Sequence, residues 1–196
     1  MMKWELQTHE VNAFCYYSNI LDDDQIQSIV EMGDKLVLED ALIGGDLNEP
    51  GKIDKEVRNT LIGWVPTTED NAWLYRTLTD IIIAANDKWF GFDLNHIESL
   101  QYSVYKENGF YEKHIDHFHR GPGQYPRKLS FTLQLTDPSE YEGGEVMIHN
   151  AKEPWAIPKD KGTITFFPSY TLHEVLPVTK GIRKNLVGWV HGPRWK

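Results

Sequence analysis

The sequence KLSFTLQLT, residues 128–136, predicts the fold more directly than any other stretch. Apolar side chains occupy every second position, and the side chains between them are short, polar and uncharged. Because successive residues of a strand point to opposite faces of a sheet, this alternation predicts a strand with one apolar and one polar face. The apolar residues are Leu129, Phe131, Leu133 and Leu135, and the polar ones are Ser130, Thr132 and Gln134. The polar face suits a polar cavity as well as solvent.

Short runs of the same kind recur on both sides of this stretch, separated by segments rich in Gly, Pro and Asn. Many short strands at this spacing favour a β-sandwich or barrel. The expected strands are Leu100–Lys106, Tyr111–His117, Lys128–Leu135, Glu145–His149, Thr163–Phe167, His173–Val178 and Ile182–His191. Gly143 and Gly144 are expected to form a tight turn before the strand that starts at Glu145.

The first half of the chain carries helical patterns instead. One helix is expected after the candidate N-caps Asp22, Asp23 and Asp24, and its core side chains are Ile26, Ile29, Val30 and Leu36. A second helix is expected across residues 68–90, and its core side chains are Leu74, Leu78, Ile81 and Ile82. Between them, Ala41–Val57 is rich in Gly and charge, which predicts a long loop. This loop is either a lid over a substrate or a plain solvated loop.

Length and composition predict one globular domain over residues 1–196. The net charge of −9 disfavours binding to nucleic acid. A single cysteine, Cys15, excludes a disulfide framework and a Cys-rich zinc site, and we expect it to be a buried core thiol. We expect a cytoplasmic protein without a membrane partner, because no signal-peptide pattern or long apolar run is visible. The tryptophans Trp64, Trp73, Trp89 and Trp155 are expected to pack in the core or against helices.

The sequence HIDHFH, residues 114–119, holds candidate metal ligands. In a strand, His114 and Asp116 would share one face and His117 and His119 the other, so one metal would use one pair or the other. The first pair plus a distant histidine makes a set of two histidines and one carboxylate. This set leaves coordination positions open and suits non-haem Fe(II), although a zinc hydrolase could use it too. The candidates for the distant histidine are His149, His173 and His191.

His173 begins a strand-like run that is followed by an expected hairpin turn and then by Arg183. If Lys180 centres that turn, Arg183 pairs with Pro177 on the face of His173, about 13 Å along the sheet. A dicarboxylate bound to the metal at one end could meet the guanidinium at the other, because arginine grips a carboxylate with two hydrogen bonds. Apolar walls would come from the residues that share these faces, Val175, Val187 and Trp189.

The order of these motifs resembles the Fe(II)- and 2-oxoglutarate-dependent dioxygenases, and most closely the prolyl-4-hydroxylase-like branch with the PKHD-type hydroxylases. The motifs are Tyr105-x4-Phe110-Tyr111-x2-His114-x-Asp116, then LSFTLQLTDPSEYEGGEV, then GTITFFPSYTLHEVLPVTKGIR. The resemblance covers residues 98–193 and, more loosely, the helical half before them. It implies a mainly β fold, the double-stranded β-helix or jelly roll. Residues 1–97 would supply supporting helices and the lid loop, and residues 98–193 the catalytic core.

The resemblance also implies roles for individual residues. His114, Asp116 and His173 would bind Fe(II), and Arg183 would bind the distal carboxylate of 2-oxoglutarate. Tyr105, Val175 and Trp189 would line the cosubstrate pocket. Gln134 stands where some members have a tyrosine that binds the cosubstrate, and its amide can also donate a hydrogen bond. Tyr111 and Arg127 would contact the substrate.

The activity that follows is hydroxylation of an aliphatic C–H bond, most plausibly in a peptidyl proline, with O2 as the oxidant and ascorbate as reductant. The partner would then be a protein or peptide substrate that contains proline. One alternative keeps this chemistry but acts on a free amino acid or another small molecule. Another is a jelly-roll module that binds metal without catalysis. The sequence does not indicate an oligomeric state.

Overall fold

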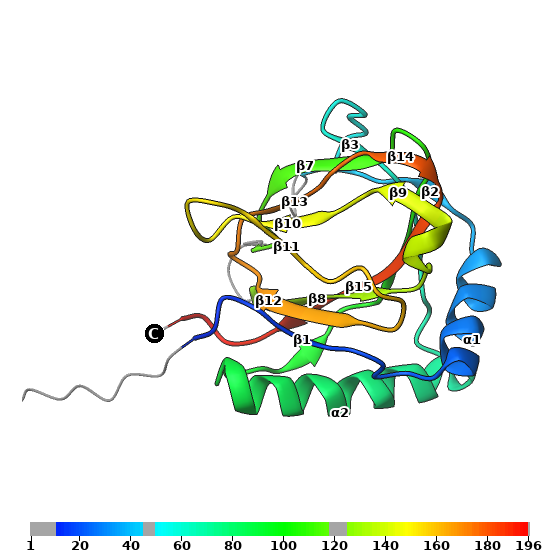
Figure 1. Cartoon of the computed structure of the whole chain (residues 1–196). Helices are drawn as coiled ribbons and strands as arrows, with labels where there is room; N and C mark the ends of the chain where they lie inside the picture. Colours follow the sequence, from blue (N-terminus) through cyan, green and yellow to red (C-terminus); the bar gives the residue numbers. More distant parts are fainter. Residues whose placement is uncertain (1–10, 45–49, 118–124, 196) are drawn as a thin grey trace, which may run out of the picture.

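Two facing β-sheets, with two helices packed against the outer face of the larger one, form the architecture (Figure 1). This computed structural model describes residues 11–44, 50–117 and 125–195. The helices are α1 (Asp23–Asp34) and α2 (Ala72–Trp89), with the short 3-10 turns η1 (Glu69–Asn71) and η2 (Pro138–Glu140). The expected mainly β fold, a double-stranded β-helix with helical support, is confirmed.

The larger sheet has the strand order β1, β12, β8, β15, β6, β4, β2, and β5 adds to β15. All of its pairings are antiparallel. Its strands are β1 (Cys15–Tyr17), β2 (Glu39–Asp40), β4 (Leu61–Trp64), β5 (His96–Ile97), β6 (Gln101–Tyr105), β8 (Arg127–Gln134), β12 (Ile164–Pro168) and β15 (Arg183–His191).

The smaller sheet has the order β11, β10, β13, β7, β3, and a separate two-stranded ribbon joins β14 to β9. The strands of this sheet are β3 (Arg58–Asn59), β7 (Phe110–His114), β10 (Val146–Ile148), β11 (Trp155–Ala156) and β13 (His173–Val175). The ribbon consists of β9 (Tyr141–Gly143) and β14 (Val178–Gly181). Gly143 and Gly144 both have positive φ, 74° and 66°, which confirms the tight turn expected before β10.

Local sequence signals explain both helices. Asp22 caps α1: its side chain accepts a hydrogen bond from the backbone N–H of Gln25, and the Gln25 side chain accepts one from the backbone N–H of Asp22. Ile26 and Ile29 are buried as expected, whereas Val30 is only partly buried. In α2 the buried side chains recur with helical spacing, and they include Leu74, Leu78 and Ile82.

Strand β8 separates two different environments. Its apolar face, Leu129, Phe131 and Leu133, joins the large core cluster that also contains the buried residues of α1 and α2. Its polar face, Ser130, Thr132 and Gln134, is also buried, at 1%, 5% and 2% exposure. Because these polar side chains point away from the helices, they look into the space between the two sheets. The alternation left a polar cavity and solvent both open for this face, and in the structure the face is buried, with Thr132 lining a pocket.

A second, smaller core lies between the sheets. It consists of Tyr105, Val146, Ile148, Ile157, Phe167, Val175 and Val178, with Phe14 and Tyr111 packed against it. Cys15 is 8% exposed and belongs to the large cluster, so its interpretation as a core thiol is confirmed. Trp73 and Trp89 also pack against that cluster. Trp64 and Trp155, however, are 47% and 57% exposed, so the expectation of core packing is wrong for both.

The expected hairpin that pairs Pro177 with Arg183 does not form. After β13 the chain leaves the smaller sheet, pairs with β9 as β14, and then enters the larger sheet as β15. Arg183 therefore pairs with Tyr105 of β6. Gly181 permits this change of sheet, because its φ of 76° and its close approach to Glu140 are incompatible with a Cβ atom.

The first half of the chain contributes more strands than its helical patterns predict. β2, β3, β4 and β5 all come from it, and β4 pairs directly with β6. Such strands of two to four residues are too short to show an alternating pattern. Part of the expected loop Ala41–Val57 is also ordered into a bridge between Ile43 and Lys52. Within the described ranges, no helix is long and apolar enough to cross a membrane.

Candidate functional site

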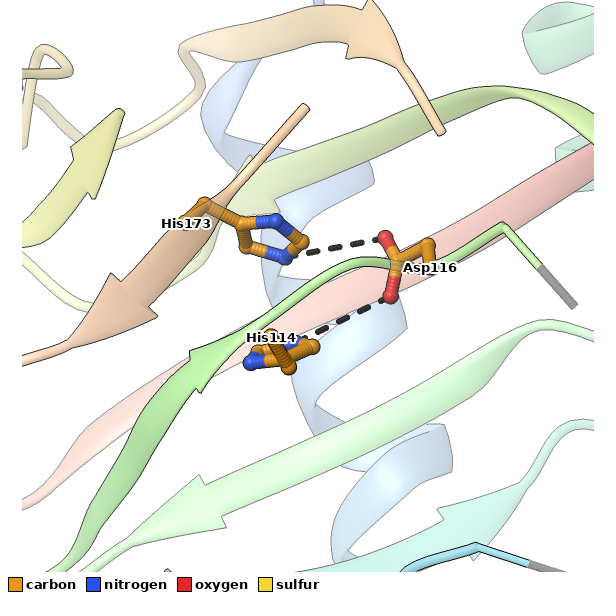
Figure 2. A group of neighbouring side chains, drawn as sticks. All are labelled: His114, Asp116 and His173. Atoms are coloured by element: carbon orange, nitrogen blue, oxygen red, sulfur yellow. Dashed lines mark ion pairs between the residues drawn. The ribbon is translucent and has the colours of Figure 1, made fainter. Parts of the chain in front are cut away.

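The structure brings together one set of three metal-competent side chains, His114, Asp116 and His173 (Figure 2). In the described part of the chain, no other group of three or more His, Cys, Asp or Glu residues meets in this way. Their ligand atoms all lie within 4.8 Å of one another. Nε2 of His114 lies 3.8 Å from one Asp116 oxygen, and Nε2 of His173 lies 3.6 Å from the other.

The smaller sheet positions these residues. His114 is the last residue of β7 and pairs directly with His173, the first residue of β13. The expected strand Tyr111–His117 is therefore shorter than predicted, because β7 loses its partner at this point. Beyond His114 the backbone leaves the sheet, and the Asp116 carboxylate turns toward both imidazoles (Figure 2).

Backbone carbonyls fix the tautomer of both histidines. The Nδ1–H of His114 donates to the carbonyl of Glu112 at 2.7 Å, and that of His173 donates to the carbonyl of Thr171 at 2.9 Å. Because a carbonyl oxygen can only accept, Nδ1 carries the proton in each ring. Each Nε2 is then left with a free lone pair, which is what a metal requires.

Electrostatics favours a neutral His114 imidazole beside an ionised Asp116 carboxylate. Burial, together with the nearby His173, lowers the pKa of His114 to about 3. Burial would by itself raise the pKa of Asp116, but His173, His114, Arg127 and the Ser130 hydroxyl outweigh it and keep that pKa below its usual value. At neutral pH the His114 imidazole is therefore neutral and the Asp116 carboxylate is ionised.

This donor set fits a first-row divalent metal such as Fe(II). Two imidazoles and one carboxylate from one side leave coordination positions open, and no thiolate takes part. The remaining histidines lie elsewhere. Nε2 of His149 contacts Glu174 at 2.7 Å, Nε2 of His191 contacts Glu98 at 2.9 Å, and Nδ1 of His117 contacts the carbonyl of Arg127. Of the three candidates for the distant histidine, only His173 reaches His114. His119 lies outside the described residues.

A pocket of about 880 Å³ opens beside the three side chains, a size suited to a small organic ligand. Of the residues expected around a cosubstrate, Tyr105, Val175, Arg183 and Trp189 line it. Val187, the other expected wall residue, lines it too. Arg183, Val187 and Trp189 therefore share one face of β15 as predicted, although the predicted hairpin does not form.

Arg183 is 1% exposed, and no carboxylate of the described residues pairs with it. Its Nη2 donates to the side-chain oxygen of Gln134 at 3.0 Å, and its Nη1 donates to that of Asn185 at 3.3 Å. Asn185 in turn donates to Thr132 at 2.9 Å. Gln134 does not line the pocket and supports Arg183 from behind. A buried guanidinium held only by neutral amides is well suited to bind an anion.

The indole of Trp189 supplies a further polar group in the pocket. Its Nε1 is buried and makes no hydrogen bond with the described residues. Because buried N–H groups nearly always find an acceptor, this atom is suited to a ligand that brings one. Arg183 and Trp189 thus fit a small, carboxylate-bearing molecule such as 2-oxoglutarate.

The two expected substrate residues also line the pocket. The Tyr111 ring stacks on the His114 ring, with centroids 3.5 Å apart and planes at 17°. Arg127 donates two hydrogen bonds of 2.8 Å to Glu98, and its guanidinium lies 3.8 Å from the Trp189 ring centroid. Arg127 is therefore already neutralised by a carboxylate.

Among the pocket residues that sequence reasoning missed are Arg58, Trp64 and Glu98. Arg58 lies in a strand of two residues, which has no recognisable pattern. The Trp64 ring lies 6.3 Å from that of Trp189, and its exposure follows from its position at the pocket. A lone acidic residue such as Glu98 gives no signal in the sequence. The Ile43 and Val57 parts of the expected lid loop also line the pocket, while residues 45–49 lie outside the described ranges.

Residues 100–191 match the family model of the 2OG-Fe(II) oxygenase superfamily. A PKHD-type hydroxylase of Gloeothece citriformis is 45% identical over 94 residues, which is 48% of this chain and 43% of that protein. A PKHD-type hydroxylase of Crocosphaera subtropica is 40% identical over 97 residues, 49% of this chain and 44% of that protein. The chain thus matches less than half the length of these curated relatives.

Solved structures share the whole fold. A Pseudomonas putida prolyl-4-hydroxylase has a TM-score of 0.72 at 20% identity and covers 93% of this chain and 94% of its own. A Trichoplax adhaerens prolyl hydroxylase in complex with a hypoxia inducible factor peptide fragment has a TM-score of 0.71 at 18% identity, over 92% of this chain and 84% of its own. At these identities the likeness concerns the fold.

Proposed function

We propose that the protein is a member of the 2OG-Fe(II) oxygenase superfamily, whose family model residues 100–191 match, and that it is a 2-oxoglutarate-dependent dioxygenase that hydroxylates an aliphatic C–H bond. Residues 1–97 and 98–193 would act together as one catalytic domain. The pocket supports this view, because Arg58 and Trp64 of the first part line it together with His173 and Arg183 of the second.

His114, Asp116 and His173 would hold Fe(II). The two Nδ1–H groups are fixed by the carbonyls of Glu112 and Thr171, so the metal would meet both rings at Nε2 without any change of tautomer. With bound Fe(II), 2-oxoglutarate and O2 would yield succinate and CO2 while the second oxygen atom converts a substrate C–H into C–OH.

Arg183 would bind the distal carboxylate of 2-oxoglutarate, and Tyr105, Val175 and Trp189 would form the walls around it. Gln134 and Asn185 are positioning residues in this proposal, because each accepts one N–H of Arg183 and keeps the guanidinium fixed. Burial of Arg183 strengthens its interaction with a carboxylate, since little water competes for either partner.

The observation that carries the proposal is the presence in one pocket of two different groups suited to a ligand. One is the cluster of three metal-ligand atoms within 4.8 Å, and the other is the buried Arg183 without a carboxylate partner. A metal-binding module without catalysis would need only the first. A cosubstrate that chelates the metal and carries a second carboxylate requires both.

A peptidyl proline is the substrate that we propose, with Tyr111 and Arg127 at the substrate side of the pocket. The similar solved structures support it, because two are named prolyl hydroxylases and one holds a peptide fragment. Ascorbate would serve as the reductant that keeps the metal in its Fe(II) state.

The direct test measures succinate formation from 2-oxoglutarate with Fe(II), ascorbate and O2, with and without proline-containing peptides. Turnover, at least uncoupled, is expected for the wild-type protein and should be lost in Asp116→Ala and in Arg183→Met. His149→Ala is the matched control, because it removes a histidine of the same sheet that contacts Glu174 rather than the site.

Absence of both turnover and 2-oxoglutarate binding in the wild-type protein would refute the oxygenase proposal. Turnover that is stimulated by a free amino acid but by no peptide would leave the chemistry in place and replace the proposed substrate.

A further inference from the structure

Arg58 holds a buried positive charge at the wall of the pocket, opposite the sheet that carries Arg183. It lies in β3, where it pairs with Tyr111 of β7, and only 9% of it is exposed. Its guanidinium carbon lies 4.5 Å from the centroid of the Tyr111 ring. That ring stacks in turn on His114, so a single aromatic ring separates the Arg58 charge from a candidate metal ligand.

No anion of the described residues neutralises this charge. Arg58 forms no ion pair there, and its Nε is buried without a hydrogen-bond partner. The carboxylates that line the same pocket have other partners: Asp40 pairs with Lys55 at 2.8 Å, Glu98 with Arg127, and Asp116 belongs to the metal cluster. Glu39 is exposed to solvent.

The three arginines of the pocket therefore differ in the partners of their guanidinium groups. Arg127 is neutralised by two hydrogen bonds to Glu98, and Arg183 donates to two neutral amides. Among the described residues, the guanidinium of Arg58 has only a cation–π contact with the ring of Tyr111. A buried guanidinium is stable when its N–H groups and its charge are satisfied, so a ligand that brings a carboxylate would complete this site.

Arg58 and Arg183 lie in different sheets: Arg183 in the larger one and Arg58 in β3, at the edge of the smaller one. If Arg183 binds the distal carboxylate of 2-oxoglutarate, a carboxylate bound by Arg58 would come from the substrate. Val57, the neighbour of Arg58, and Ile43 line the pocket beside it, in the part of the chain that lies before the oxygenase segment. Arg58 thus lies away from the residues assigned to 2-oxoglutarate.

We propose that Arg58 binds a carboxylate of the substrate, and that the substrate is a peptide with an aspartate or glutamate close to the residue that is hydroxylated. The inference rests on the proposed dioxygenase function and names the chemical class of its substrate. The same carboxylate could come from a peptide C-terminus, and the experiment separates these two sources.

The experiment uses the whole chain with Mn(II) in place of Fe(II) and saturating 2-oxoglutarate. The probes are N-acetyl-glutamate N-methylamide, its glutamine counterpart, and N-acetyl-alanine, which has only a terminal carboxylate. The readout is the broadening of the probe proton resonances by Mn(II), which reports binding near the metal and does not depend on turnover. The variants are Arg58→Gln, Arg58→Lys and, as a control distant from the pocket on the exposed face of α2, Arg76→Gln.

The glutamate probe should bind about tenfold more tightly than the glutamine probe, the usual difference made by a charge-assisted pair. This preference should disappear in Arg58→Gln, persist in Arg58→Lys and be unchanged in Arg76→Gln. Stronger binding of N-acetyl-alanine than of the glutamate probe would show a terminal carboxylate instead of an acidic side chain. Equal binding of the glutamate and glutamine probes, or an unchanged preference in Arg58→Gln, would overturn the proposal.

A substitute variant and a separate titration of 2-oxoglutarate allow the test to decide between the possible outcomes. If Arg58→Gln does not fold, Arg58→Met replaces it, because its unbranched stem can keep the packing against Tyr111. Binding of 2-oxoglutarate is titrated separately and depends on Arg183, so its failure would reject the dioxygenase function. A lost glutamate preference with intact 2-oxoglutarate binding would reject only the role of Arg58.

Discussion

At the scale of single residues, the same local hydrogen bond orients both candidate metal histidines. Each donates its Nδ1–H to the carbonyl of the residue two positions before it, Glu112 for His114 and Thr171 for His173. The chain itself therefore selects the tautomer with a free Nε2. Gln134 and Asn185 hold Arg183 in a similar way: each accepts a hydrogen bond from its guanidinium without neutralising its charge.

Gln134→Glu should weaken binding of 2-oxoglutarate strongly, by at least about tenfold, because a buried carboxylate would pair with Arg183 and compete with the ligand. The side chains have nearly the same shape, so packing is preserved. Isothermal titration of the metal-loaded protein with 2-oxoglutarate measures the effect. Lys184→Gln is the control for a changed charge nearby, because this side chain pairs with Asp34 at the surface. Equal affinity of Gln134→Glu and wild type would contradict the assignment.

Cys15 should react very slowly with a thiol reagent in the native protein. Burial, opposed only in part by Lys88, raises the pKa of its thiol to about 12 from 9.0. A rise of three units lowers the reactive thiolate fraction at pH 8 about 1000-fold. Labelling rates in native and denaturing buffer measure this, and rapid native labelling would contradict it.

The sign of the pH dependence follows from the same shift. Because the folded-state pKa of Cys15 is raised, its contribution to stability is complete below pH 9.0 and is lost as the pH rises toward about 12. As the pH rises between these two values, the free energy of unfolding of Cys15→Ala should therefore fall less than that of the wild type. Denaturant unfolding at both pH values measures the difference.

At the scale of elements, close packing between α1 and the larger sheet requires a glycine at position 33. Gly33, near the end of α1, is buried against the ring of Tyr102 in β6. The Tyr102 hydroxyl donates to Asp34 at 2.7 Å, which fixes the ring in place. A glycine in a helix is normally unfavourable, and here the missing side chain lets the helix approach the sheet.

Gly33→Ala should destabilise the protein by about 1–3 kcal/mol, the range expected for overpacking. Helix propensity alone predicts the opposite sign, because alanine is favoured over glycine by about 1 kcal/mol. A Cβ atom at Gly33 would lie 2.4 Å from two carbons of the Tyr102 ring, so packing should win. Urea unfolding measures the change.

Ser28→Ala, on the exposed face of the same helix, is the matched control and should change stability little. A stabilised Gly33→Ala variant would show that the Tyr102 ring can move aside.

At the scale of the whole molecule, two sheets have to meet before the site exists. His114 and His173 come from neighbouring strands of the smaller sheet, whereas Arg183 and Trp189 come from the larger one. The pocket lies between them and is closed by residues of the N-terminal part. Metal binding should therefore be coupled to the global free energy of unfolding.

A divalent metal at one hundred times its dissociation constant should raise the free energy of unfolding by about 2.7 kcal/mol, because it binds only the folded state. Chelation with EDTA should reverse the gain. Denaturant unfolding with and without Mn(II) measures it. The gain should be absent in Asp116→Ala and intact in His149→Ala, and a metal-dependent gain in both variants would place the ion elsewhere.

The sequence predicted most of the longer strands of the second half, because each shows alternation or is bounded by turn residues, but it missed the short strands β9, β11 and β14. The four-residue β4 and the two-residue β2, β3 and β5 were also missed, since they form only through pairing with other strands: β4 with β6, β2 with β4, β3 with β7 and β5 with β15. The hairpin at Arg183 was wrong for the same reason: a turn signal indicates a reversal of direction but does not say which sheet the chain joins next.

By itself, the sequence determined the spacing of His114 and Asp116, the polar face of β8, the capped helices and the motif order of the oxygenase family. These are local features, encoded by neighbouring residues and their periodicity. The family resemblance implied His173 as the third ligand, and the tertiary structure brings its side chain to His114 and Asp116 while His149 and His191 contact Glu174 and Glu98. Only the tertiary structure decided that Arg183 is neutralised by no carboxylate of the described residues, and that Arg58 reaches the same pocket. Those outcomes depend on which strands pair across the molecule, and burial and charge balance arise only when the sheets close around the pocket.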